Sequence, residues 1–178
     1  MLVSGVINGC DTLHFFVNHW PSRYGGIMET AGYRKRAAAT LRKTITRLNE
    51  EYSHPLIVCM GDFNDQPSDE SLALILGKAG MNSQLVNLSA AWQKNEIKTL
   101  KNEYSWEVFD QWIVSNSFLE SHKCFRFVNA EIVKLPFLLE DDLKFGGLKP
   151  KRTYIGFKYQ EGFSDHLPIL IRLQMLNY

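Results

Sequence analysis

The amino-acid sequence predicts a mixed α/β (α+β) fold, in which helices pack outside a layered β-sandwich. Three observations predict it: a hairpin pattern in residues 2–18, an amphipathic helical pattern at Tyr33–Tyr52, and a continuous apolar run at Leu56–Met60. The chain has 178 residues, which suits one globular domain, and 45% of them are hydrophobic, as in ordinary globular proteins. We therefore interpret residues 1–178 as a single domain.

The first segment is predicted to form a β-hairpin. Strands are expected at Leu2–Ile7 and Leu13–Asn18, joined by the turn sequence Asn8-Gly9-Cys10-Asp11. Asn-Gly favours such a turn because tight hairpins require positive backbone φ angles. Since the first strand begins at the first residues without any lead-in, we expect the domain to be entered partway through and its N-terminal part to be missing.

The next two elements are a helix and a buried strand. Apolar residues at three-to-four spacing predict an amphipathic helix that packs on a sheet over Tyr33–Tyr52. These residues are Ala37, Leu41, Ile45, Leu48 and Tyr52. Pro55 stops the helix from continuing, and the apolar run Leu56–Met60 is typical of a strand that is covered on both faces.

A second helix is predicted after the buried strand. Ser68 is its expected N-cap, Asp69 and Glu70 lie in its first turn, and Gly77 or Gly80 ends it. Further strands are predicted at Val108–Val114, Cys124–Val128 and Pro168–Leu173, and a loop or irregular helix at Leu135–Gly147.

The charge of the chain is nearly balanced. Twenty basic and nineteen acidic side chains give a formal charge of +1, which provides no global field for a long polyanion, so small phosphate esters and phospholipid head groups stay in contention. A local basic cluster is interpreted as a solvated helix face, with phosphate contact as the alternative. It comprises Arg34, Lys35, Arg36, Arg42 and Lys43. No apolar stretch approaches the roughly 20 residues of a transmembrane segment.

Polar clusters follow or precede the predicted strands at four places. They are Asn18–Arg23, Gly61–Asp65, Asp110–Gln111 and Ser164–His166. Strand ends bring side chains from distant sequence positions to one mouth of a layered fold. Hydrolysis of a phosphate ester needs an activated water, stabilisation of negative charge and help for the leaving group, and carboxylates, an amide and histidines can supply these functions.

These motifs resemble a known superfamily. Gly61-Asp62-Phe63-Asn64 and Ser164-Asp165-His166 are similar to the two signature motifs of the endonuclease/exonuclease/phosphatase superfamily, which includes pancreatic deoxyribonuclease, sphingomyelinases and inositol polyphosphate 5-phosphatases. Asn18–Arg23 resembles its central histidine motif, and Asp110 resembles the aspartate on the strand before the last motif. The sequences Pro150–Tyr154 and Gly162–Pro168 are similar to those of bacterial members. The resemblance covers nearly the whole chain and implies a deoxyribonuclease-like fold.

The resemblance implies roles for residues near the C-terminus. It assigns His166 as the base or the ligand of the scissile phosphate, oriented by Asp110. It also assigns Asp165 as a carboxylate associated with Mg²⁺ or Mn²⁺.

The remaining roles fall on the central motifs. By resemblance, Asp62 and Asn64 position the water and the phosphate, and His19 contacts a phosphoryl oxygen or protonates the leaving group. Arg23 is expected to add positive charge near the phosphate, although bracing a loop is the alternative for it and for Asp65.

One part of the family pattern has no counterpart here. Members contribute an asparagine and a glutamate, the principal metal ligand, from a segment before the His19 motif, and Glu29 is a poor substitute because it follows that motif. We therefore expect a C-terminal portion of a longer metal-dependent phosphodiesterase, nuclease or phosphatase. An export signal would be lost with the missing segment, so the cellular location stays open. The alternatives are a catalytically silent half-domain that pairs with another chain through an exposed sheet edge and, less favoured by the charge, a nucleic-acid-binding module without chemistry.

Overall fold

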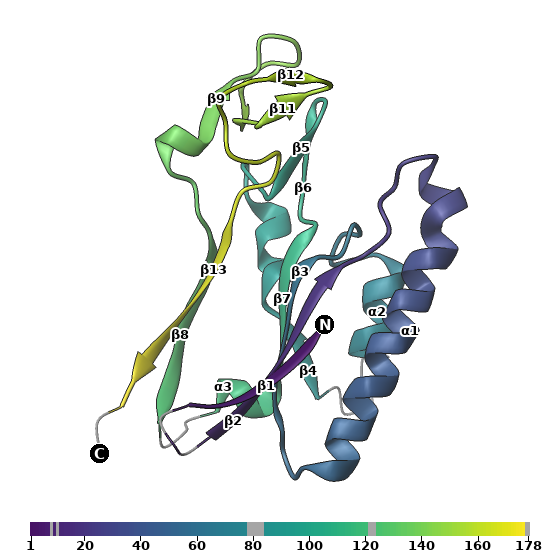
Figure 1. Ribbon diagram of the computed structural model, residues 1–178, viewed down its shortest axis with the longest axis vertical. Coiled ribbons are helices and arrows are strands. Elements are labelled where there is room, and N and C mark those ends of the chain that lie inside the picture. The colour runs from purple at the N-terminus through teal and green to yellow at the C-terminus, as the bar shows by residue number, and fades with distance from the viewer. Residues whose placement is uncertain (8, 10, 78–83, 121–123, 177–178) are drawn as a thin grey trace.

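The computed structural model describes residues 1–7, 9, 11–77, 84–120 and 124–176 (Figure 1). Its central element is a mixed sheet with the strand order β1-β2-β3-β7-β4. These strands are β1 Leu2–Ile7, β2 Asp11–His19, β3 Leu56–Asp62, β7 Asp110–Ser115 and β4 Leu85–Asn87. Strands β2 and β3 run parallel, and the other neighbouring pairs are antiparallel. The predicted mixed α/β class is confirmed.

The predicted N-terminal hairpin is present. Strand β1 pairs with β2 from Leu2 opposite Phe16 to Ile7 opposite Asp11. Strand β2 is longer than expected at both ends and reaches His19. The predicted turn falls partly outside the described residues.

Helices α1 and α2 cover one face of the sheet (Figure 1). Helix α1 (Ile27–Glu51) begins six residues before the predicted start, since its first residues are exposed and carry no apolar periodicity. Helix α2 (Glu70–Leu76) ends at Gly77 as expected. The prediction of Ser68 as its N-cap was wrong, because Asp69 occupies that position.

Strand β3 is covered on both faces, which explains its continuous apolar run. Ile57 and Cys59 are fully buried on the side of the helices. Leu56 and Val58 pack into the second core on the opposite side. The predicted buried strand is therefore confirmed, and it extends to Asp62.

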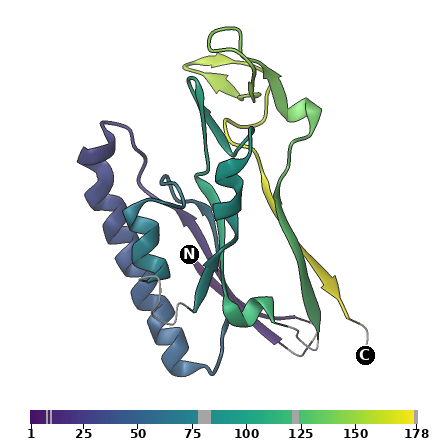
Figure 2. The same ribbon diagram turned by 180° about the vertical axis from the view of Figure 1, so that it is seen from behind.

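The second core lies between the central sheet and an antiparallel ribbon on its other side (Figures 1 and 2). The ribbon consists of β8 (Phe125–Ile132) and β13 (Ile169–Met175), where two of the predicted strands were expected. Helix α3 (Asn116–Leu119) and the 3₁₀ helix η1 (Leu88–Lys94) also contribute to this core.

Short elements gather at one end of the molecule (Figure 1). They form the hairpins β5 (Leu100–Asn102) with β6 (Ser105–Glu107), β9 (Leu139–Asp141) with β10 (Leu148–Pro150), and β11 (Tyr154–Ile155) with β12 (Lys158–Tyr159). The segment predicted as a loop or irregular helix holds β9 and the 3₁₀ helix η2 (Pro136–Leu138). None of the helices in the described ranges has the length and apolar character needed to cross a bilayer.

Candidate active site

Strand register places three polar side chains next to one another. His19 at the end of β2 lies opposite Asp62 at the end of β3, and Asp62 lies opposite Asp110 at the start of β7. Parallel strands end at the same sheet edge, and an antiparallel neighbour begins there. Since residues in register project to the same face of a sheet, these three side chains point the same way.

His166 joins this row from the far end of the sequence. Its Nδ1 lies 2.7 Å from Oδ2 of Asp110, and its backbone N–H donates to Oγ of Ser164. The segment is fixed to the β5 region, because Leu100 forms a β-bridge with His166 and the Leu167 N–H donates to the Thr99 carbonyl. Burial by itself lowers the pKa of His166. The hydrogen bond and negative charge of Asp110, with the charges of Asp62 and Asp165, outweigh burial and raise that pKa.

Asp62 is held by the turn that follows it. Its Oδ1 accepts from the Asn64 backbone N–H at 2.8 Å, and its Oδ2 accepts from the Asn64 amide Nδ2 at 2.9 Å. Asn64 adopts a φ of 51°, in the left-handed region that asparagine tolerates better than most residues. His19 Nε2 lies 3.7 Å from Asp62 Oδ2. Burial and the charge of Asp110 raise the pKa of Asp62, against the lowering effects of the Asn64 backbone and both histidines.

These side chains line one open cavity of about 590 Å³, within the usual size range of small-molecule sites. Its lining contains six of the residues that the sequence predicts for the site: His19, Asp62, Asn64, Asp110, Asp165 and His166. Ser22, Leu100, Lys101, Asn102, Arg152 and Ser164 complete it. Residues from all four polar clusters therefore line the same cavity. Their chemical roles stay predictions.

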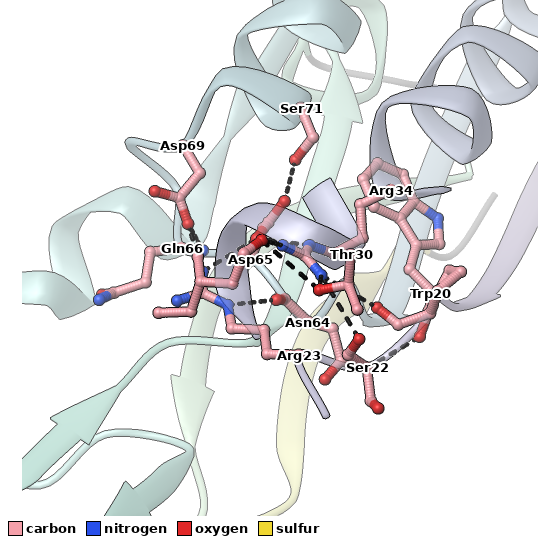
Figure 3. Close-up of polar contacts among 12 residues, drawn as sticks. Trp20, Ser22, Arg23, Thr30, Arg34, Asn64, Asp65, Gln66, Asp69 and Ser71 are labelled. Atoms are coloured by element: carbon pink, nitrogen blue, oxygen red, sulfur yellow. Dashed lines mark hydrogen bonds and ion pairs between the residues drawn. The ribbon is translucent and has the colours of Figure 1, made fainter. Parts of the chain in front are cut away.

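Arg23 does not line this cavity. Its Nη2 lies 2.9 Å from Oδ1 of Asp65 and 2.5 Å from Oδ2 of Asp69, and its Nε donates to the Asn64 carbonyl (Figure 3). The guanidinium also stacks over the Phe109 ring at 4.6 Å. Arg23 thus braces the loop that carries Asn64, which was the alternative considered for it.

Arg34 corrects the interpretation of the basic cluster. Its side chain is only 1% exposed, and its Nε lies 2.7 Å from Oδ1 of Asp65 (Figure 3). The other oxygen of Asp65 accepts from Ser71 Oγ at 2.6 Å. Arg34 stands four residues before the buried Ala38 and continues the buried stripe of α1, and this spacing was the signal that could have revealed it. Of the rest of the cluster, Arg42 donates to two carbonyls at the end of α2.

Two basic residues of the cavity were given no role from the sequence. Lys101 lies 3.0 Å from Asp142 in a buried ion pair and also donates to the Gly146 carbonyl. Arg152 lies within the motif Pro150–Tyr154, and that motif was the available signal.

The described residues do not complete a metal site by themselves. Asp62 and Asp165 line the same cavity, and carboxylate oxygens are suitable ligands for Mg²⁺ and Mn²⁺. In the described ranges, however, no three His, Cys, Asp or Glu side chains are arranged to hold a metal ion.

The chain matches a known protein family over almost its whole length. The family model of the endonuclease/exonuclease/phosphatase family matches residues 1–175. The chain belongs to this family. Among curated protein sequences, none matches this endonuclease/exonuclease/phosphatase chain significantly.

Solved structures share the fold of this family member. D. rerio TDP2 complexed with single strand DNA product has a TM-score of 0.56 at 13% identity, covering 97% of this chain and 60% of that chain. The human Nocturnin catalytic domain with bound sulfate has a TM-score of 0.54 at 16% identity, covering 93% of this chain and 48% of that chain. Bacteroides thetaiotaomicron mannosyl-6-phosphatase has a TM-score of 0.50 at 14% identity, covering 94% of this chain and 52% of that chain. The chain thus spans between 48% and 60% of these three structures.

Proposed function

We propose that this chain carries active-site residues of a phosphoester hydrolase that uses Mg²⁺ or Mn²⁺. The observation that carries the proposal is the row formed by His19, Asp62 and Asp110, closed by the 2.7 Å contact between Asp110 and His166. Two imidazoles beside half-buried carboxylates provide groups that can accept or donate a proton. Family membership supports the same reaction class.

His166 and His19 are proposed to act on different parts of the phosphoester. Since Asp110 holds Nδ1 of His166, Nε2 is the ring nitrogen that serves as the base or binds the scissile phosphate. His19 is 80% exposed at the cavity, and we assign it to a phosphoryl oxygen or to protonation of the leaving group. Asp62 and Asn64 position the water and the phosphate between them.

The metal is part of the proposal through Asp165. When bound, Mg²⁺ or Mn²⁺ would neutralise negative charge on the phosphoryl oxygens. Asp165 is the proposed ligand within this chain, and a principal glutamate would come from outside the described residues.

The test is hydrolysis of bis(p-nitrophenyl) phosphate and of plasmid DNA by the purified protein with Mg²⁺ or Mn²⁺, and again with EDTA. We expect the His166→Ala variant to lose at least about a hundredfold in rate, as for removal of a general base. The control is His54→Ala, since His54 precedes the opposite end of β3. Equal rates for wild type and His166→Ala would overturn the hydrolase proposal, and activity that survives EDTA would overturn the metal requirement.

The substrate is proposed only as a class of phosphate esters: a nucleic acid, a phospholipid head group or a small phosphoester. The structural neighbours include a TDP2 complex with single strand DNA product and a mannosyl-6-phosphatase, so both nucleic acid and sugar phosphate belong in the substrate panel. A preference of at least tenfold in kcat/KM would identify the class.

The second candidate function is a catalytically silent half-domain that pairs with another chain. Strand β1 is the outermost strand on its side of the described sheet, and Leu2, Val3 and Val6 are exposed on it. An apolar sheet edge of this kind favours pairing with a further strand. Sedimentation should then show a concentration-dependent dimer that charged substitutions in β1 abolish. A monomer that binds Mg²⁺ or Mn²⁺ tightly and stoichiometrically in calorimetry would contradict this candidate.

A further inference from the structure

The basic side chains around the cavity differ in their partners. Lys101 is only 5% exposed and is neutralised by Asp142, and Arg23 is bound by two carboxylates outside the cavity. Arg152 lines the cavity and is partly exposed. Within the described part of the chain, the Arg152 side chain makes no hydrogen bond or ion pair. Its guanidinium is therefore available to a ligand.

The backbone around Arg152 is fixed against the segment that leads to His166. The Phe163 N–H donates to the Lys151 carbonyl at 2.8 Å, and the Thr153 hydroxyl donates to the Phe163 carbonyl at 2.7 Å. Gly162 allows this close approach, because a Cβ there would lie 2.3 Å from the carbonyl oxygen of Arg152. The position of Arg152 is thus coupled to the loop that carries the proposed base.

The charges of the cavity leave a role for this arginine. Asp62, Asp110 and Asp165 all line it, so an anionic phosphoryl group needs compensating positive charge to enter. A guanidinium presents paired N–H donors that match two phosphate oxygens, which the compact ammonium of a lysine cannot do.

We infer that Arg152, rather than Arg23, binds the non-bridging oxygens of the substrate's phosphoryl group. The inference rests on the proposed function, because it assigns a substrate contact to the same site. It also identifies the ligand chemistry as a phosphoryl anion, whether it belongs to a monoester or to a diester.

The direct test is titration of the ¹⁵N-labelled chain with inorganic phosphate, followed by NMR. We expect Arg152→Gln to weaken phosphate binding by about tenfold or more, as for the loss of a hydrogen bond to a charged group, and Arg152→Lys to recover part of it. The matched control is Arg172→Gln, since Arg172 pairs with Glu131 on the β8–β13 ribbon. Unchanged binding in Arg152→Gln, or no binding by the wild-type chain, would overturn the inference.

Kinetics separate this inference from the proposed function. If the protein hydrolyses p-nitrophenyl phosphate or its bis ester, Arg152→Gln should raise KM or lower kcat. A larger effect on the monoester than on the diester would show that Arg152 contacts a terminal phosphate. Hydrolysis with unchanged KM and kcat in this variant would overturn the inference and leave the proposed function intact. If the protein hydrolyses neither ester but binds phosphate in a way that depends on Arg152, the inference would stand and the proposed function would be overturned.

Discussion

Nδ1 of His166 lies 2.7 Å from Oδ2 of Asp110, although 56 residues separate them in the sequence. Asp110 starts a central strand, and His166 belongs to a loop that β5 holds in place. The contact therefore depends on the packing of the small hairpins against the end of the central sheet. It also leaves Nε2 as the ring nitrogen of His166 that Asp110 does not contact.

Asp110→Asn should lower the pKa of His166. Burial would still lower that pKa, whereas the carboxylate charge that raises it would be gone. The protonated pair stabilises the fold fully below the unfolded-state pKa of about 6.5, and this contribution is lost as the pH rises through the raised folded pKa. The difference in the free energy of unfolding between wild type and variant should therefore decrease as the pH rises from about 6.5 through the raised folded pKa of His166. NMR titration of the His166 ring and urea unfolding at several pH values measure both effects. An unchanged pKa would show that Asp110 does not control the imidazole.

Asp62→Asn should remove a pH-dependent cost to stability. Because burial first, and then the charge of Asp110, raise the folded pKa of Asp62, the unfolded chain releases this proton at a lower pH than the folded chain. Wild-type stability therefore falls as the pH rises from about 3.9 through the raised folded pKa, and the cost is constant above it. The free energy of unfolding of the variant minus that of wild type should rise across this window and then level off. A flat difference would contradict the prediction.

Arg34→Met should destabilise the fold by about 3–5 kcal/mol, the usual cost of removing one partner of a buried ion pair. The variant leaves Asp65 buried without its 2.7 Å contact to the guanidinium. Arg172→Met is the control, since its pair with Glu131 is exposed and should contribute no more than about 1 kcal/mol. Urea unfolding measures both variants. A cost no larger than that of the control would mean that Arg23 and Ser71 compensate for the lost ion pair.

Gly61→Ala should distort the strand end that carries Asp62. Gly61 has a φ of +117°, and a Cβ there would lie 2.1 Å from the Asn18 carbonyl oxygen on β2. A cost of about 1–3 kcal/mol is expected from the backbone conformation alone. Gly5→Ala is the control, because a Cβ at Gly5 meets nothing within 4 Å and should change stability by less than about 0.5 kcal/mol. Equal unfolding midpoints for the two variants would rule out this strain.

Several elements could be predicted because their signals are local. Leu56–Met60 is apolar without interruption, since helices and a second core cover β3 on opposite faces. The start of α1 at Ile27 could not be predicted, because its first turns are exposed and show no apolar periodicity. The N-cap of α2 was misplaced by one residue, since Asp69 also pairs with Arg23, a contact that sequence spacing does not report.

The sequence by itself determined the mixed α/β class, the buried central strand and the motifs that identify the family, because short-range periodicity and residue type encode them. Only the tertiary structure decided which polar groups lie together. Strand register aligned His19, Asp62 and Asp110, and loop packing brought His166 to them. The tertiary structure also pairs Arg23 with Asp65 and places Arg152 at the cavity. The sequence does not report this, because the partner of a long charged side chain depends on which groups the fold places within its reach.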